Sequence, residues 1–324
     1  MASSNPPRGE RVPKDLQGLL RFCAEATKNE DHTTESTFEN MPEEKRKWLE
    51  EALNEMTVNP VERMKACLST LRVEDMDEDL LDKKIAALDE LHDWCEFIDF
   101  AIDFHKIGGF SVLHYLLHHD EPEMRWKGLE LIAALVQNNP YCQKAVLEEP
   151  NLFKDILLIL DTDSDATART KALLATSCLT RDFPEAQKVF VDSDGFSITL
   201  RAMQSNVEKL KIKAAFMLSS FVTDKPEYKN ILCDMGMIDQ LIGHLGEEHS
   251  SFHEHLLSAI LTIVQDFPRG IKEFRRPELD LEQTLLQKQR DLAGKEEFME
   301  ELQYAKELLR LMQEDQSENQ DVAR

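Results

Sequence analysis

Four proline junctions divide the middle of this 324-residue chain into stretches of nearly equal length. They read Asn139-Pro140, Asp182-Phe183-Pro184, Asp224-Lys225-Pro226 and Asp266-Phe267-Pro268. Successive prolines are 184−140=44, 226−184=42 and 268−226=42 residues apart. Proline suits the first turn of a helix, because its missing N–H would have no partner there. The spacing therefore predicts one helical unit that is repeated between residues 127 and 268.

Within each repeat, apolar residues recur at fixed distances before the proline. The fifth and eighth residues before it share one helix face. They are Leu135 and Ile132, Leu179 and Thr176, Phe221 and Leu218, and Ile263 and Ile260. A second break, at 108–110, 150–152, 194–196 and 236–238, contains glycine or asparagine, which take the left-handed conformation at low cost. Each unit thus reads as a short, a medium and a long helix, at 140–149, 151–160 and about 166–182 in the first.

Three helices per unit and a period of 42 to 44 residues favour armadillo repeats over the two-helix HEAT pattern. No unit can bury its apolar stripe alone, so the units must stack into one continuous core. The predicted fold is all-α, a right-handed superhelical solenoid of armadillo-type repeats with irregular helical caps. We expect the long helices to line its concave surface and that surface to be the working face.

The remaining parts of the chain follow from where this pattern begins and decays. We expect a flexible N-terminal segment with a short amphipathic helix at 1–41, an N-terminal helical cap at 42–79, armadillo repeats at 80–276, C-terminal capping helices at 277–312 and a disordered tail at 313–324.

Charge and cysteine usage exclude several classes of function. Lys+Arg 38 against Asp+Glu 62 gives a net charge of −24, which would repel nucleic-acid phosphates. The six cysteines contain no C-x-x-C pair, which suits reduced thiols in a reducing compartment. No apolar run approaches the roughly 20 residues of a membrane span, and residues 1–17 lack the apolar core of a secretory signal. We expect a cytoplasmic monomer, with nuclear access left open.

Few side chains form a pattern that could carry chemistry. The spacing of Asp161, Asp163 and Asp165 resembles the start of a calcium loop, but the glycine and glutamate of that motif are missing, which favours helix capping. Among His249, His253 and His255 no third metal ligand is in register, which favours a solvated helix face. There is no phosphate-binding glycine loop and no recognisable nucleophile. We predict no catalytic residue, no metal site, no cofactor and no enzymatic activity.

The predicted working face carries a partner-binding site at positions thirteen, ten, six and three before the proline. Its residues are Lys127, Glu130, Lys171, Leu174, Cys178, Arg181, Lys213, Phe216, Ser220 and Thr223. A basic row on such an acidic chain would steer an acidic partner toward the face. The alternative is that these are ordinary solvated lysines on long helices.

Several segments resemble one known family when taken in order. They are Leu16-Gln17-Gly18-Leu19-Leu20-Arg21-Phe22, Asn59-Pro60-Val61-Glu62, the Asp-Phe-Pro junctions and Glu300-Glu301-Leu302-Gln303-Tyr304-Ala305-Lys306-Glu307-Leu308-Leu309. This order is similar to the eukaryotic Hsp-binding-protein/Fes-type nucleotide exchange factors of the 70-kDa heat-shock chaperones. The resemblance implies an armadillo domain whose concave face clasps one lobe of the chaperone's nucleotide-binding domain and promotes ADP release. It also implies that an N-terminal segment engages the peptide-binding domain, here through Leu16, Leu19, Leu20 and Phe22.

Two other classes of armadillo protein would present different residues on this surface or lack exchange activity. An importin-type peptide carrier would present repeated Trp and Asn at the ten-before and six-before positions, and this chain does not. An adaptor or scaffold without exchange activity, for example in the ubiquitin pathway, stays open as the alternative.

Overall fold

The structure is a computed structural model, and it describes residues 59–73 and 78–321. The chain divides into two compact units, Met1–Arg63 and Met64–Arg324, and all packing discussed below lies within the second. The predicted segment at 1–41 and part of the predicted cap at 42–79 fall outside the described residues. Among the described helices, none combines the length and the apolar character that a bilayer crossing demands.

All regular structure in the described part is helical, and it follows the predicted short, medium and long order. Before the repeats, α3 spans Pro60–Leu71. The short helices are α5 Ile98–Lys106, α8 Pro140–Glu148, α11 Pro184–Asp192, α14 Lys229–Asp234 after the 3-10 turn η3 Pro226–Tyr228, and α17 Pro268–Phe274. The medium ones are α6 Leu113–Leu117 after η2 Gly109–Val112, α9 Leu152–Thr162, α12 Gly195–Met203, α15 Met237–Leu245 and α18 Leu281–Leu292. The long ones are α4 Glu78–Cys95, α7 Pro122–Val136, α10 Ala166–Thr180, α13 Glu208–Asp224, α16 Phe252–Val264 and α19 Met299–Asp321. Two further 3-10 turns are η4 Pro277–Leu279 and η5 Glu296–Phe298.

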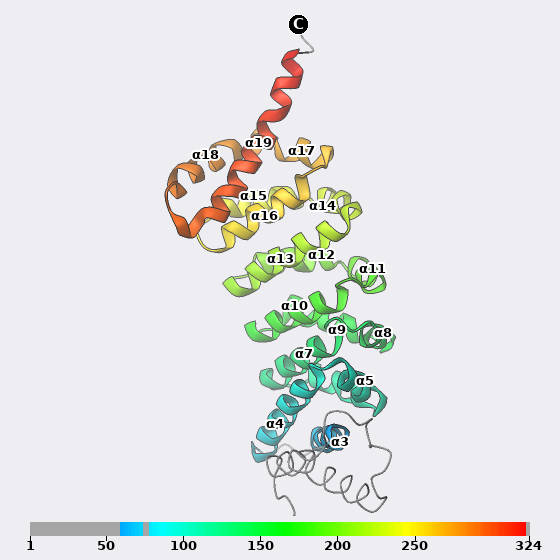
Figure 1. The fold of residues 1–324 in the computed structure, drawn as a ribbon. Coiled ribbons are helices and arrows are strands. Elements are labelled where there is room, and N and C mark those ends of the chain that lie inside the picture. The colour runs from blue at the N-terminus through cyan, green and yellow to red at the C-terminus, as the bar shows by residue number, and fades with distance from the viewer. Residues whose placement is uncertain (1–58, 74–77, 322–324) are drawn as a thin grey trace, which may run out of the picture. The chain divides into compact units, whose positions relative to one another are not determined.

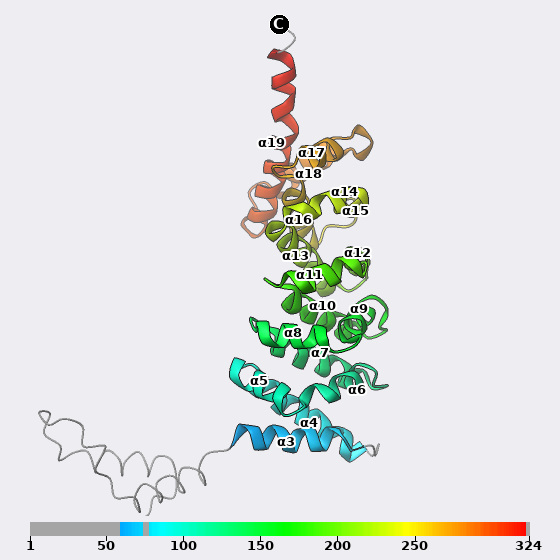
Figure 2. The same cartoon turned by 90° about the vertical axis from the view of Figure 1, so that its right-hand side faces the viewer.

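The long helices pack side by side in sequence order, α4 on α7, α7 on α10 and so on to α16 on α19 (Figure 1). Figure 2, turned by 90°, looks onto the short helices α5, α8, α11, α14 and α17 along the same stack. This is the arrangement of an all-α armadillo-type solenoid, so the predicted fold class is confirmed. The last unit, α17 to α19, keeps the same order although its sequence has lost the repeat pattern. Helix α19 continues to Asp321, beyond the predicted end of the capping helices at 312.

The apolar stripe that defines the repeat is buried in every unit. All eight predicted residues are at most 6% exposed: Ile132, Leu135, Thr176, Leu179, Leu218, Phe221, Ile260 and Ile263. Thr176 can occupy this position because its hydroxyl donates to the carbonyl of Ala172, 2.8 Å away, which satisfies the buried polar group within its own helix. The stripe therefore forms the continuous core between neighbouring long helices.

The junctions turn the chain with left-handed residues just before proline. Asn138, Asp182 and Asp266 have φ of 53°, 52° and 54°. Asn and Asp tolerate this region better than other non-glycine residues, which explains their place in the repeat. At the second break the left-handed residues are Gly108, Asn151, Asp194 and Gly236. In the third unit the left-handed residue is therefore the aspartate and not the neighbouring Gly195.

Gly195 has a different reason for being glycine. A Cβ atom at this position would lie 2.4 Å from the ring of Phe190. That ring is 1% exposed and packs against Phe196 and Phe221, with ring centroids 5.5 Å and 5.0 Å away. The missing side chain lets α11 and α12 approach closely.

Side chains from the short helices bind the C-terminal end of the long helix in the same unit. Gln143 Nε2 on α8 donates to the carbonyls of Cys178, Leu179 and Arg181 at 3.0, 3.1 and 3.0 Å. Lys229 on α14 donates to the carbonyl of Gln265 at 2.7 Å. The last carbonyls of a helix have no partner within it, so these bonds satisfy groups that would otherwise be buried unpaired.

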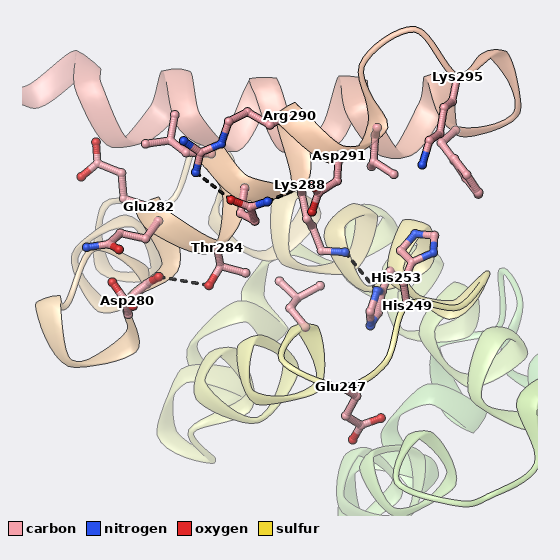
Figure 3. A pocket seen from close by; sticks show the side chains of 16 residues that line it. Glu247, His249, His253, Asp280, Glu282, Thr284, Lys288, Arg290, Asp291 and Lys295 are labelled. Atoms are coloured by element: carbon pink, nitrogen blue, oxygen red, sulfur yellow. Dashed lines mark hydrogen bonds between the residues drawn. The ribbon is translucent and has the colours of Figure 1, made fainter.

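A buried polar cluster joins the C-terminal helices. Lys288 Nζ on α18 lies 3.0 Å from His253 Nδ1 on α16 and 2.9 Å from Glu301 Oε1 on α19. His253 Nε2 donates to the carbonyl of His244 at 3.2 Å, so its Nδ1 accepts from the Lys288 ammonium. Figure 3 shows Lys288 reaching toward His253 beside an open cavity of about 990 Å³. The sequence interpretation of a solvated face is wrong for His253, which is 2% exposed.

We expect Gly195→Ala to lower the free energy of unfolding by about 1–3 kcal/mol, because the new methyl group overpacks the buried Phe190 ring. Gly243→Ala in α15 is the matched control, since nothing lies within 4 Å of its added Cβ. That substitution should be neutral or stabilising by about 0.5–1 kcal/mol. Urea unfolding followed by circular dichroism measures both, and equal stability of the two variants would contradict the packing.

We also expect stability to depend on His253 below neutral pH. Burial and then the charge of Lys288 lower the pKa of His253 from 6.5 to about 4. Between these values the unfolded chain binds the extra proton, so stability is present above pH 6.5 and is lost as the pH falls toward 4. Relative to His253→Gln, which keeps hydrogen-bonding groups but does not titrate, the wild type should lose on the order of 3 kcal/mol by pH 4. Parallel stability curves for the two proteins from pH 7 to pH 4 would exclude this assignment.

Candidate functional site

The outward sides of α7, α10, α13 and α16 form one continuous surface, here called the long-helix face. It consists of the residues ten, six and three before each junction proline. They are Glu130, Ala134, Gln137, Leu174, Cys178, Arg181, Phe216, Ser220, Thr223, Ser258, Thr262 and Gln265. Residues three or four apart lie on one side of a helix, and the long helices stack in register, so the columns continue from unit to unit. All are half-buried or exposed except Cys178, which is 6% exposed.

The predicted basic row at the thirteen-before position is mostly neutralised. Lys127 is 9% exposed and ion-paired with Asp89 of α4, and Lys171 is ion-paired with Glu130 of α7. Both ammonium groups also flank the ring of Trp126, at 4.7 Å and 5.9 Å from its centroid. These lysines therefore connect α4, α7 and α10, and much of their charge is compensated within the protein.

Two cations lie near the middle of the long-helix face: Arg181, which belongs to it, and Lys213, thirteen residues before Pro226. Arg181 is exposed, and its side chain is not ion-paired with any described residue. Burial raises the pKa of the neighbouring Cys178 thiol, and the positive charges of Arg181 and Lys213 oppose this shift, so both cations lie close to the thiol. Arg181 also lines a small hollow together with Ser220 of α13. Arg181 and Lys213 thus bring positive charge to the boundary between α10 and α13.

Phe216 is the most exposed apolar residue of the long-helix face. Its side chain is 61% exposed on α13, although Ala215 and Met217 on either side are buried. Leu174, ten before the preceding proline, is half-buried one unit away on α10. Interface hot spots are enriched in aromatic residues and arginine, and the long-helix face offers exposed Phe216 and exposed Arg181.

Trp126 was missed in the sequence analysis. It lies half-buried on α7, with the ammonium groups of Lys127 and Lys171 close to its ring. It stands fourteen residues before Pro140, one position outside the columns that the repeat indicated. Its residue type could have identified it, because tryptophan is enriched at interface hot spots.

The acidic loop before α10 has a structural role. Asp163 accepts from Arg125 at 2.7 Å, Asp161 accepts from Arg201 at 2.6 Å, and Asp165 caps α10 by accepting from the backbone N–H of Ala168 at 2.7 Å. Burial raises the pKa of Asp163, but the hydrogen bonds from Arg125 and from the backbone of Asp165, together with the charges of Arg125 and Arg169, outweigh it and the pKa is lowered. The capping interpretation is confirmed for Asp165, while Asp161 at the end of α9 and Asp163 pair with arginines.

The predicted N-terminal residues Leu16, Leu19, Leu20 and Phe22 lie outside the described part of the chain. The structure therefore brings together only the residues predicted on α7, α10 and α13. What these can do is present charge and one aromatic side chain to a partner.

Comparison with known proteins adds two family matches. The family described as "Nucleotide exchange factor Fes1" matches residues 16–104, and "SIL1/FES1/HPBP1 C-terminal domain" matches residues 100–231. Together the matches run from the N-terminal segment into α14.

Individual relatives extend this similarity along the chain. Hsp70-binding protein 1 of Mus musculus is 39% identical over 319 residues, covering 95% of this chain and 87% of the relative. Hsp70-binding protein 1 of Homo sapiens is 39% identical over 315 residues, covering 92% of this chain and 85% of the relative. The Hsp70 nucleotide exchange factor FES1 of Eremothecium gossypii is 30% identical over 149 residues, covering 45% of this chain and 52% of the relative.

Among solved structures the similarity is one of fold. A designed armadillo repeat protein aligns with a TM-score of 0.60 and 15% identity, covering 77% of this chain and 99% of the design. An engineered protein aligns with a TM-score of 0.61 and 19% identity, covering 79% of this chain and 97% of the other. The armadillo architecture and the sequence similarity together lead to one conclusion: the chain belongs to the SIL1/FES1/HPBP1 family.

Proposed function

We propose that this protein is a nucleotide exchange factor of the 70-kDa heat-shock chaperone. In this proposal the long-helix face binds the chaperone's nucleotide-binding domain and promotes the release of ADP. The observation that carries the proposal is the similarity to Hsp70-binding protein 1 along nearly the whole chain. The protein itself performs no chemistry in this scheme, since it acts by binding alone.

The energetic requirement for exchange is modest. A binding protein speeds nucleotide release when it binds the opened, ADP-free state more tightly than the closed one. By thermodynamic linkage, ADP must then weaken its binding by the same factor. A hundredfold faster release corresponds to about 2.7 kcal/mol. An interface of standard size, roughly 1,600 Å², can supply such a difference.

The middle of the long-helix face is the part suited to this contact. Phe216 offers apolar area that is exposed to water in the free protein, so its burial against a partner is favourable. Arg181 and Lys213 lie nearby on a chain whose net charge is −24, so they mark a local reversal of sign. Such a reversal supports steering of an acidic surface toward this region.

We expect Phe216→Ala and Arg181→Glu each to weaken chaperone binding by about tenfold or more, because interface hot spots cost at least 1–2 kcal/mol when removed. Stimulated release of labelled ADP should fall in parallel. Both side chains are exposed, so melting temperatures should not change. Reversing Lys171 is less informative, since it would place a carboxylate against Glu130 and destabilise the stack.

Leu158→Ala is the matched control for these variants. Leu158 is 57% exposed on α9, a medium helix away from the long-helix face. It should bind the chaperone and stimulate ADP release as the wild type does. Full activity of both Phe216→Ala and Arg181→Glu would show that the partner binds elsewhere, and unchanged ADP release despite binding would leave a scaffold as the function.

We expect deletion of residues 1–38 to spare binding to the nucleotide-binding domain and to slow the release of a labelled peptide from the chaperone. The reason is that, in this proposal, the solenoid binds the nucleotide-binding domain and the N-terminal segment binds the peptide-binding domain. Peptide-release kinetics and a binding titration with the isolated nucleotide-binding domain measure the two effects. Loss of binding in the deletion protein would contradict this division.

A further inference from the structure

Three metal-ligating side chains converge between two consecutive units on the medium helices. His114 lies on α6, His118 directly follows that helix, and Asp155 lies on α9, which packs against α6. One ligand atom from each lies within 4.8 Å of the others. The two histidines are four residues apart and share a helix face, but Asp155 comes 41 residues after His114, so only the stacking of units brings it near.

We propose that His114, His118 and Asp155 bind a divalent ion of the zinc type. Two imidazoles and one carboxylate form a common protein ligand set for zinc, with the fourth position open to water. Zinc and copper bind such nitrogen-rich sets more tightly than the harder ions magnesium and calcium do.

The orientation of His118 suits this role. Its Nδ1–H donates to the carbonyl of His114 at 2.9 Å, since a carbonyl oxygen can only accept. The lone pair of Nε2 is therefore free, and this atom lies 3.9 Å from Asp155 Oδ1. A second hydrogen bond of this kind is what fixes the tautomer and ring orientation of metal-binding histidines.

The spacing requires only small movements. His114 Nδ1 lies 3.1 Å from Asp155 Oδ2, and tetrahedral zinc bonds of about 2.0–2.1 Å place ligand atoms roughly 3.3 Å apart. The side chain of His118 is 61% exposed, so it can move closer without disturbing the core. On binding, the proton that His114 Nδ1 shares with Asp155 leaves that atom, and the neutral ring carries its N–H on Nε2.

The charge around Asp155 supports a cation at this place. Its side chain is 19% exposed, and its ion-pair partners among the described residues are the two histidines, with no lysine or arginine among them. A second cluster, His249, His253 and Glu301, has similar ligands. There the ammonium of Lys288 already contacts His253 and Glu301, so the place of a cation is filled by the protein.

A bound ion would connect α6 to α9 and thus two neighbouring units. Because the unfolded chain does not hold these ligands together, the binding free energy would add to the stability of the solenoid. The three ligands belong to no long helix. Exchange activity should therefore be the same with and without metal. Metal binding and nucleotide exchange can be tested independently of each other.

The test titrates the full-length, tag-free protein with CoCl2 and ZnCl2 in excess Mg²⁺, which occupies the many surface carboxylates. We expect one equivalent of Co²⁺ to give the visible absorption of a nitrogen-coordinated ion and one equivalent of Zn²⁺ to displace it. Zn²⁺ should raise the melting temperature by about 5 °C, and a chelator should reverse the shift.

His118→Ala and Asp155→Asn should each weaken Co²⁺ and Zn²⁺ binding at least tenfold while keeping the metal-free melting temperature. His249→Ala removes a ligand of the second cluster, and His92→Ala removes a histidine near a single carboxylate; both should bind as the wild type does. Three results would overturn the proposal: no visible Co²⁺ absorption, binding lost in His249→Ala but kept in His118→Ala, or binding unchanged in all four variants.

Discussion

The structure depends on one constraint, which is that a unit of three helices cannot bury its own apolar stripe. Ile132 and Leu135 in one unit and Ile260 and Ile263 in another are fully buried, and the long helices that carry them pack against the long helices of neighbouring units. At roughly 25 cal/mol per Å² of apolar area, this burial is the main stabilising contribution to such a stack. The continuous row of long helices, and the long-helix face on its outward side, are consequences of that requirement.

Polar side chains set the register of this stack. Bonds recur between residues about one unit apart: Gln143 and Arg181 are separated by 38 residues, Lys171 and Glu130 by 41, Arg201 and Asp161 by 40, and Lys229 and Gln265 by 36. Exposed ion pairs contribute little free energy each. Their value lies in specificity: a unit shifted along its neighbour would separate Lys171 from Glu130 and Arg201 from Asp161. A short helix shifted against the long helix of its own unit would leave buried carbonyls without partners.

The same constraint decides which residues are available to a partner. A side chain on a long helix faces the core, a neighbouring helix or the solvent, and the repeat fixes which positions do each. Phe216 and Arg181 are exposed because they do not take part in the packing between units. Lys127, in contrast, is nearly buried and ion-paired with Asp89. The side chains available to a partner are thus those that stacking leaves exposed, and on the long-helix face these include Arg181 at the end of α10 and Phe216 on α13.

The sequence by itself determined the repeat, its three-helix content and the positions of the buried stripe. These features are local, since proline, left-handed Asn or Asp, and helical spacing of apolar residues act within a few residues of each other. It also indicated the columns of the long-helix face, because these follow from the same periodicity. The tertiary structure alone decided that Lys171 is paired with Glu130, that His253 is buried against Lys288, and that Asp155 lies beside two histidines. Each of these contacts joins residues of two neighbouring units, and no local pattern specifies which side chains meet when two units stack.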